Sequence, residues 1–119
     1  MADSFHDLLE ELFAPLDGVS LKRMFGGVGV FKDGVMFGLV ADDALYLKVD
    51  TTNQPRFEAE DSAPFVYDGR GKSMTMSYWR LPDRLYDEAE DFTAWAGEAF
   101  AVAVRGKASG KTAGKRRKR

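Results

Sequence analysis

The sequence predicts an α+β protein of two layers, with a five-stranded antiparallel sheet that carries helices on one face. Apolar residues recur at helical spacing near both ends of the body, at residues 5–13 and 92–103. Between these segments, short runs that alternate apolar and polar residues are separated by glycine-containing turns, which is typical of antiparallel strands. The predicted order is helix, three-strand meander, short helix, hairpin and C-terminal helix. One sheet with the helices on a single face buries the apolar side of every element.

The composition is that of one ordinary globular domain. The chain has 119 residues, of which 45% are hydrophobic and 30% are charged. It has no cysteine and one histidine, His6, which excludes disulfides, thiolate metal sites and multi-histidine metal centres. No stretch approaches the ~18 apolar residues of a membrane span, and the acidic N-terminus does not resemble a signal peptide. We therefore expect a cytoplasmic protein with no membrane partner, no metal and no cofactor.

A helix is predicted at the start of the chain, and a meander of three strands follows it. Ser4 can cap the helix, and the turn formers Pro15 and Gly18 end it. Asp33 and Gly34 join the first two strands, because a type I′ turn needs positive φ at both central residues. Alternation in the second strand predicts one face with Val35, Phe37 and Leu39, and another with Met36, Gly38 and Val40. In the third strand, alternation separates Tyr46 and Lys48 from Leu45, Leu47 and Val49.

The second half of the body is predicted to hold a short helix, a hairpin and a final helix. Asp50 or Thr51 caps the short helix, which carries Phe57. The hairpin turns across Gly69-Arg70-Gly71, and Pro82 ends its second strand. The final helix has one apolar stripe, formed by Phe92, Trp95, Ala96, Ala99, Phe100 and Ala103. A sheet this small has edge strands that need cover, so a homodimer is one expectation.

The glycine-rich stretch RMFGGVGVF, at residues 23–31, invites comparison with a phosphate-binding loop. A dinucleotide-binding G-x-G-x-x-G pattern from Gly27 needs a glycine at position 32, where Lys32 stands. A hairpin follows the stretch, whereas a pyrophosphate binds at a helix N-terminus. The glycines are therefore interpreted as a strand entrance, where they permit a bulge or a close backbone contact.

No catalytic residue is predicted. A Ser-His-Asp set would have to use His6, which lies in the first turn of a helix with no nucleophile elbow nearby. The abundant acids are typical of solvated helix faces and caps, and they show no defined carboxylate pair or calcium-loop spacing. The chain is therefore not expected to be an enzyme.

One candidate interaction surface comes from two adjacent rings. Tyr78 and Trp79 point to opposite faces of their strand, so one of them is available to a partner. Together with Arg23 and Lys48 they form the predicted contact surface. The competing interpretation is that the rings belong to the core and that Arg23 braces the fold.

The C-terminal residues 105–119 differ sharply from the body. They hold eight of the 17 basic residues and no acid, so residues 1–104 carry a charge of about −10 and the tail about +8. The tail cannot bury a core and is expected to be disordered when alone. Its cations would contact nucleic-acid phosphates weakly, without sequence preference and with strong salt dependence. The candidate phosphate contacts are Lys111, Lys115, Arg116, Arg117, Lys118 and Arg119. The alternatives are a solubility tail, or a tail that folds back onto the acidic body.

Three segments of the body together resemble a known family. KRMFGGVGVFKDGVMFGLVADDALYLKVD at residues 22–50, PRFEAE at 55–60 and MSYWRLPD at 76–83 resemble the N-terminal domain of the TfoX/Sxy family of bacterial competence regulators. The resemblance covers about residues 3–104. It implies an α+β domain with an antiparallel sheet and a role in controlling competence genes, and it implies no catalytic residue. The residues that match the family signature are Arg23, Met24, Phe25, Gly26, Gly27 and Lys48. Longer members carry a second, helical domain, where this chain has its basic tail.

The first functional hypothesis is a non-enzymatic regulatory domain, 1–104, that acts in transcriptional control of competence through contacts with an unknown regulatory protein. A second hypothesis is a nonspecific nucleic-acid-associated protein that binds DNA or RNA through residues 105–119. A third is an uncharacterised small-molecule-binding domain with a pocket near Arg23.

Overall fold

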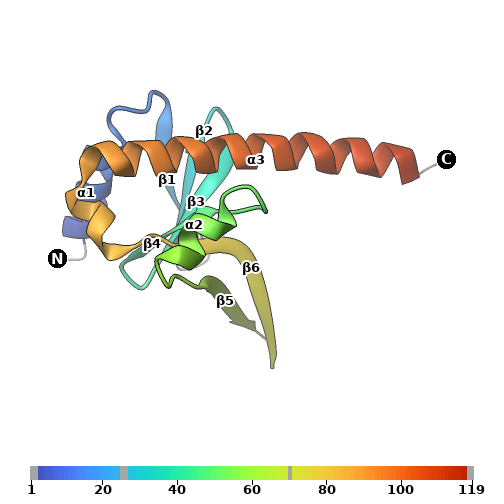
Figure 1. The fold of residues 1–119 in the computed structure, drawn as a ribbon, viewed down its shortest axis with the longest axis horizontal. Helices are drawn as coiled ribbons and strands as arrows, with labels where there is room; N and C mark the ends of the chain where they lie inside the picture. Colours follow the sequence, from blue (N-terminus) through green and yellow to red (C-terminus); the bar gives the residue numbers. More distant parts are fainter. Residues whose placement is uncertain (1–2, 25–26, 70, 118–119) are drawn as a thin grey trace.

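Three α-helices and a six-stranded antiparallel sheet make up the described part of the chain (Figure 1). The computed structural model describes residues 3–24, 27–69 and 71–117, and for residues 108–117 it describes the backbone alone. The predicted α+β class and antiparallel sheet are confirmed. In chain order the elements are α1 (Asp3–Phe13), β1 (Val19–Met24), β2 (Gly27–Lys32), β3 (Val35–Ala41), β4 (Ala44–Lys48), α2 (Gln54–Ala59), β5 (Pro64–Gly69), β6 (Lys72–Arg80), a 3-10 helix η1 (Asp83–Asp87) and α3 (Ala89–Arg117).

The sheet contains one strand more than the five that the sequence predicts. Its order is β1-β2-β3-β4-β6-β5, and the additional strand is β1 at one edge. β1 pairs antiparallel with β2, with Met24 opposite Gly27, so the stretch RMFGGVGVF contains a chain reversal. Phe25 and Gly26, which follow Met24 in the sequence, lie outside the described residues. β1 was not predicted from the sequence, because Arg23 occupies the position where the alternation begun by Val19 and Leu21 would place a third apolar residue.

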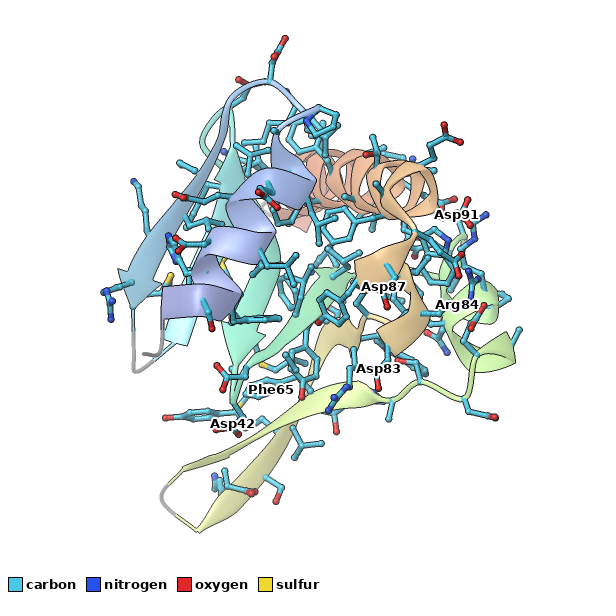
Figure 2. All side chains as sticks on the ribbon, turned by 90° about the vertical axis from the view of Figure 1, so that its left-hand side faces the viewer. Asp42, Phe65, Asp83, Arg84, Asp87 and Asp91 are labelled. Carbon is cyan, nitrogen blue, oxygen red and sulfur yellow. The ribbon has the colours of Figure 1, made fainter. Side chains whose placement is uncertain are left out.

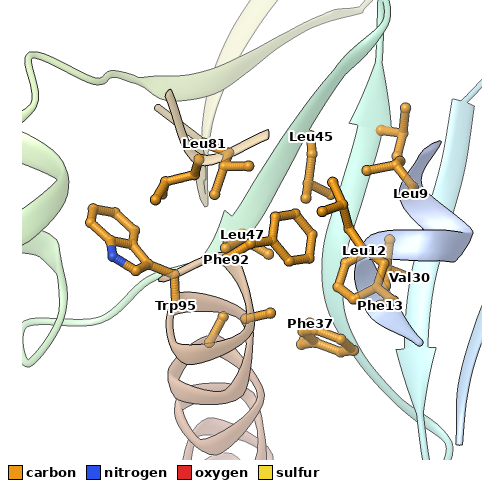
Figure 3. Packing of buried hydrophobic residues seen from close by; sticks show 14 of the residues in the cluster. Leu9, Leu12, Phe13, Val30, Phe37, Leu45, Leu47, Leu81, Phe92 and Trp95 are labelled. Carbon is orange, nitrogen blue, oxygen red and sulfur yellow. The ribbon is translucent and has the colours of Figure 1, made fainter. Parts of the chain in front are cut away.

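All the helices pack against one face of the sheet, as predicted, and the core lies between the two layers. Leu9, Leu12 and Phe13 of α1 belong to the same buried cluster as Phe92 of α3 (Figure 3). The ring of Phe13 stands edge-on to Phe92, with 5.0 Å between centroids. β4 contributes fully buried leucines from below. Edge-to-face rings of this kind add to the free energy of apolar burial, so α1 and α3 hold each other on the sheet.

A β-bulge in β3 changes the predicted faces of that strand. Val30 pairs with Gly38 but Phe31 pairs with Met36, which leaves Phe37 as an extra residue. The alternation therefore shifts within the strand, and both Phe37 and Val40 are buried in the core. The prediction that Leu39 shares a face with Phe37, and Val40 with Met36, is wrong for this reason.

The turns follow the sequence closely. Asp33 and Gly34 both have positive φ, 52° and 79°, as the predicted type I′ turn requires. The predicted hairpin between β5 and β6 is present, with Gly69 opposite Lys72 and positive φ at Gly71. Arg70 lies outside the described residues.

The predicted short helix is α2, and its Phe57 is buried. The residue at its N-cap is Asn53, in place of the predicted Asp50 or Thr51. Asn53 is 1% exposed. Its amide accepts a hydrogen bond from the backbone N–H of Asp50 and donates one to the carbonyl of Lys48. This side chain therefore shapes the whole loop between β4 and α2.

Two parts of the fold project from the body (Figure 1). The β5–β6 hairpin extends past the rest of the sheet, because β4 pairs with β6 only at residues 78–80. The helix α3 continues past the body in a different direction, and its backbone is helical to Arg117. Arg105 donates a hydrogen bond to the hydroxyl of Thr52, which attaches this point of α3 to the body. The disorder of residues 105–119 in the free protein stays a prediction.

Candidate interaction site

The side of the sheet that faces away from the helices is here called the open face. Helices α1, α2 and α3 all contribute to the core on the opposite side. Strand alternation and pairing give the open face these side chains: Lys22, Met24, Phe31, Met36, Leu39, Tyr46, Lys48, Tyr78 and Arg80. Phe65 of β5 joins them, since its ring lies 5.0 Å from that of Tyr46. The open face is therefore rich in rings and cations.

One line of paired residues crosses five strands of this face. Lys22 pairs with Gly29, Gly29 with Leu39, Leu39 with Tyr46, and Tyr46 with Arg80. Neighbouring strands are ~4.8 Å apart, so the two cations stand about 19 Å from each other at the ends of the line. The middle of the line offers an apolar and an aromatic side chain.

Gly29 keeps the open face flat at β2. A Cβ atom at Gly29 would lie 2.6 Å from the sulfur of Met24 and 2.8 Å from Cε1 of Phe31. These two side chains therefore close over the glycine, and the ring of Phe31 lies along the sheet. The close approach at Gly29 comes from side chains, whereas the sequence interpretation named a bulge or a close backbone contact.

Cations lie next to the rings of the open face. The ammonium of Lys22 lies 5.3 Å from the ring centroid of Phe31, and that of Lys48 lies 5.1 Å from Tyr78. Lys48 also donates a hydrogen bond to the hydroxyl of Ser77 at 2.6 Å. Burial raises the pKa of Tyr78, so its phenol stays neutral beside the lysine at physiological pH.

Among the described residues, the acids do not assemble into a metal-binding set. No group of three or more His, Cys, Asp or Glu side chains in this part of the chain is placed to hold a metal ion. At the end of the molecule shown in Figure 2, Arg84 forms ion pairs with Glu60, Glu88 and Asp91. A hydrogen bond from Arg84 lowers the pKa of Glu60, which makes that carboxylate a poor general acid.

The hollow found among the described residues lies away from Arg23, where the third hypothesis places its pocket. This open hollow of about 560 Å³ lies between the end of α1 and the start of β1, with Glu10, Phe13 and Asp17 in its wall. Arg23 stands at the other end of β1, outside this wall.

Comparison with known families agrees with this architecture. The family model of the TfoX N-terminal domain matches residues 11–103 of the chain. The chain belongs to the TfoX N-terminal domain family. This family is associated with competence regulation, and its members are generally non-catalytic regulators. No curated protein matches the chain.

The structure of this TfoX-type domain separates the four residues of the predicted contact surface. Lys48 and Tyr78 are cross-strand partners on the open face. Trp79 points to the other side, where its ring packs against Phe57 at the core. Arg23 is exposed at the sheet edge, three strands from β4 and on the helix-covered side with Val28. Only Lys48 and Tyr78 are therefore brought together.

Several residues of the open face were missed in the sequence, among them Lys22, Phe31 and Arg80. The alternation of Tyr46 and Lys48 was visible, but the register that joins them to β1 and β6 depends on non-local pairing.

The predicted phosphate contacts Lys111, Lys115, Arg116 and Arg117 belong to the helical backbone of α3, and Lys118 and Arg119 lie outside the described residues. None of the helices in the described part is long and apolar enough to cross a membrane.

Proposed function

We propose that this TfoX-type domain is a non-enzymatic, cytoplasmic regulator that acts in the transcriptional control of competence by binding a regulatory protein. The family supports the regulatory role. The observation that carries the proposal is the β5–β6 hairpin, here called the arm and defined as residues 64–80. It exposes Val66 at 46%, Tyr67 at 53% and Met74 at 59%. Exposed apolar side chains gathered on one projecting element are typical of a protein contact surface.

The geometry of the arm fits a protein partner. Tyr67 and Met74 are cross-strand partners and share one side of the ribbon, while Val66 pairs with Thr75. β5 is the edge strand of the sheet, so its outer backbone groups are available to another strand. A two-stranded ribbon is only marginally stable by itself, and a partner that covers its apolar side would stabilise it.

The test places a photo-reactive amino acid at position 67 in the full chain, in cells that report transcription of competence genes. We expect a cross-linked regulatory protein, and we expect Tyr67→Ser combined with Met74→Ser to lower reporter transcription. The matched control is Val104→Ser, which removes an apolar side chain that is 40% exposed on α3. Undiminished transcription in the folded arm variant contradicts the proposal. A cross-link to a second copy of this chain instead makes the arm a homodimer contact.

We propose a second candidate function, weak binding of nucleic acid by the C-terminal cations. Its support is the charge of about +8 in residues 105–119, on a helix that leaves the body after Arg105. Lys107, Lys111 and Lys115 recur every four residues, a spacing that favours one stripe on a helix. Such cations release counterions from nucleic acid when they bind.

Deleting residues 105–119 tests this candidate. In low salt the full chain should bind duplex DNA without sequence preference, and its affinity should fall steeply as salt rises. The shortened chain should lose this binding while its circular dichroism shows a folded body. Equal retention of DNA by both chains would rule the tail out as the binding element.

A further inference from the structure

We propose that the open face is a binding site for single-stranded nucleic acid, distinct from the exposed apolar side chains of the arm and from the C-terminal cations. The site is centred on Phe31 and Tyr46, with Lys22, Lys48 and Arg80 around them. It goes beyond the protein contact proposed for the arm and does not depend on it.

The charge of the open face selects an anionic partner. Its strands contribute Lys22, Lys48 and Arg80 to this face, and the acid within the described strands, Asp68 of β5, pairs with Ser73 near the tip of the arm, although the body as a whole carries about −10. Arg80 forms an ion pair with Asp83, whose carboxylate oxygen lies 3.6 Å from the guanidinium. Face-to-face pairing of two copies would oppose like charges, whereas a phosphate backbone would neutralise them.

The rings of the open face suit unstacked bases. Antiparallel sheets that bind single strands present aromatic side chains on an uncovered face, on which successive bases stack. Phe31 lies flat over Gly29, and Tyr46 and Phe65 support each other edge-on at 5.0 Å, so the rings are held in place before any ligand arrives. All three rings are half-buried, which leaves part of each accessible.

The spacing of rings and cations fits one strand laid across the sheet. Lys22 contacts the ring of Phe31, so it lies where it can meet a phosphate next to a base stacked on that ring. Lys48 lies over Tyr78, which is 9% exposed, and adds a second cation to the same face. A duplex keeps its bases stacked on each other and offers this face only its phosphates. The open face should therefore prefer single strands, whereas the C-terminal cations should not.

The experiment measures fluorescence anisotropy of a labelled oligo-dT and of a labelled DNA hairpin with the full chain at fixed salt. We expect tighter binding of oligo-dT. Replacing both rings, Phe31→Leu with Tyr46→Leu, should weaken oligo-dT binding about tenfold and leave hairpin binding unchanged, because only stacking is lost. The matched control, Tyr67→Leu, removes an exposed ring from the arm and should change neither affinity.

Two results overturn the proposal. One is equal affinity for oligo-dT and hairpin in the unmodified chain. The other is an oligo-dT affinity that Phe31→Leu with Tyr46→Leu leaves unchanged in a folded variant. If that variant fails to fold, the double variant Lys22→Gln with Lys48→Gln replaces it, and Lys72→Gln with Lys107→Gln is its control. Loss of the preference for oligo-dT in the first double variant alone supports the site. An equal loss in the control overturns the proposal. The arm experiment reads out a different contact, so either proposal can fail without the other.

Discussion

At the scale of single residues, Gly27 illustrates why the glycines near the start of the sheet are structural. A Cβ atom at this position would lie 2.5 Å from the backbone carbonyl oxygen of Val40, which cannot move without disturbing the ladder between β2 and β3. We expect Gly27→Ala to lower the free energy of unfolding by roughly 1–3 kcal/mol, because the extra methyl group forces the strands apart. Urea denaturation measures the change.

The control for this substitution is Gly97→Ala in α3. A Cβ atom at Gly97 would meet nothing within 4 Å. Alanine in a helix is more stable than glycine by roughly 0.5–1 kcal/mol, so this variant should be at least as stable as the original. If both variants behave alike, steric contact with Val40 does not explain the glycine at position 27.

Tyr86 completes the hydrogen bonding of β4 where β6 ends. Its hydroxyl accepts a hydrogen bond from the backbone N–H of Leu45 at 3.0 Å. We expect Tyr86→Phe to lower the free energy of unfolding by about 1–3 kcal/mol, because it leaves this buried N–H without a partner. Tyr67→Phe, on the exposed arm, should cost nothing measurable, and equal effects would contradict the role given to Tyr86.

The same tyrosine makes stability depend on alkaline pH. Burial raises the pKa of Tyr86 above its ordinary value of 10.0, so the unfolded chain loses the phenolic proton first. Its contribution is therefore fully present below pH 10.0 and is lost as pH rises through the folded pKa. Urea midpoints measured from pH 8 upwards should fall less steeply for Tyr86→Phe than for the unmodified chain. Parallel curves would show that Tyr86 does not titrate in this way.

At the scale of elements, Asn53 determines how β4 leads into α2. Its buried amide bonds the backbone on both sides of the loop, at Asp50 and Lys48. Lys48 belongs to the open face, so the loop also positions part of the candidate site. We expect Asn53→Ala to destabilise the protein by roughly 2–3 kcal/mol, since two buried backbone groups lose their partners.

A useful comparison for Asn53 is its neighbour Gln54, whose amide bonds only the exposed carboxylate of Glu58. Gln54→Ala should change the free energy of unfolding by less than about 0.5 kcal/mol, as is usual for surface positions. Chemical denaturation of both variants separates the two cases. A small effect at Asn53 would mean that the loop holds its shape by other contacts.

At the scale of the whole molecule, the division of charge sets the behaviour of the C-terminus. The apolar stripe of α3 ends at Ala103, and the following residues combine repeated cations with Gly106, Gly110 and Gly114. Like charges four residues apart and glycines both destabilise a helix. We expect amide hydrogens after Arg105 to exchange rapidly in the free protein and to become protected when a polyanion is added.

Hydrogen exchange monitored by mass spectrometry tests this expectation, with the buried segment around Ala96 as the protected reference. Protection of residues 108–119 equal to that reference in the free protein would show a stable helix instead. Rapid exchange that a polyanion leaves unchanged would indicate that the tail serves solubility.

Short-range patterns in the sequence determined much of this fold. Patterns among residues close in the sequence predicted the helical periods, the Asp33-Gly34 turn and the helix that carries Phe57. Short sequence motifs likewise predicted the family. Each of these predictions is confirmed. Contacts within a few residues follow from local backbone preferences, which a sequence shows directly. The absence of cysteine and the charge of the tail are likewise readable without a structure.

Only the tertiary structure decided which distant residues share a surface. The bulge at Phe37 shifted the faces of β3, and Arg23 turned out to extend an unpredicted strand that lies far from Lys48. A one-residue change of register sends every later side chain to the other face, and pairing between strands is set by packing across the whole sheet. For this reason Lys22 and Arg80, 58 positions apart in the sequence, came to stand on one line of the open face.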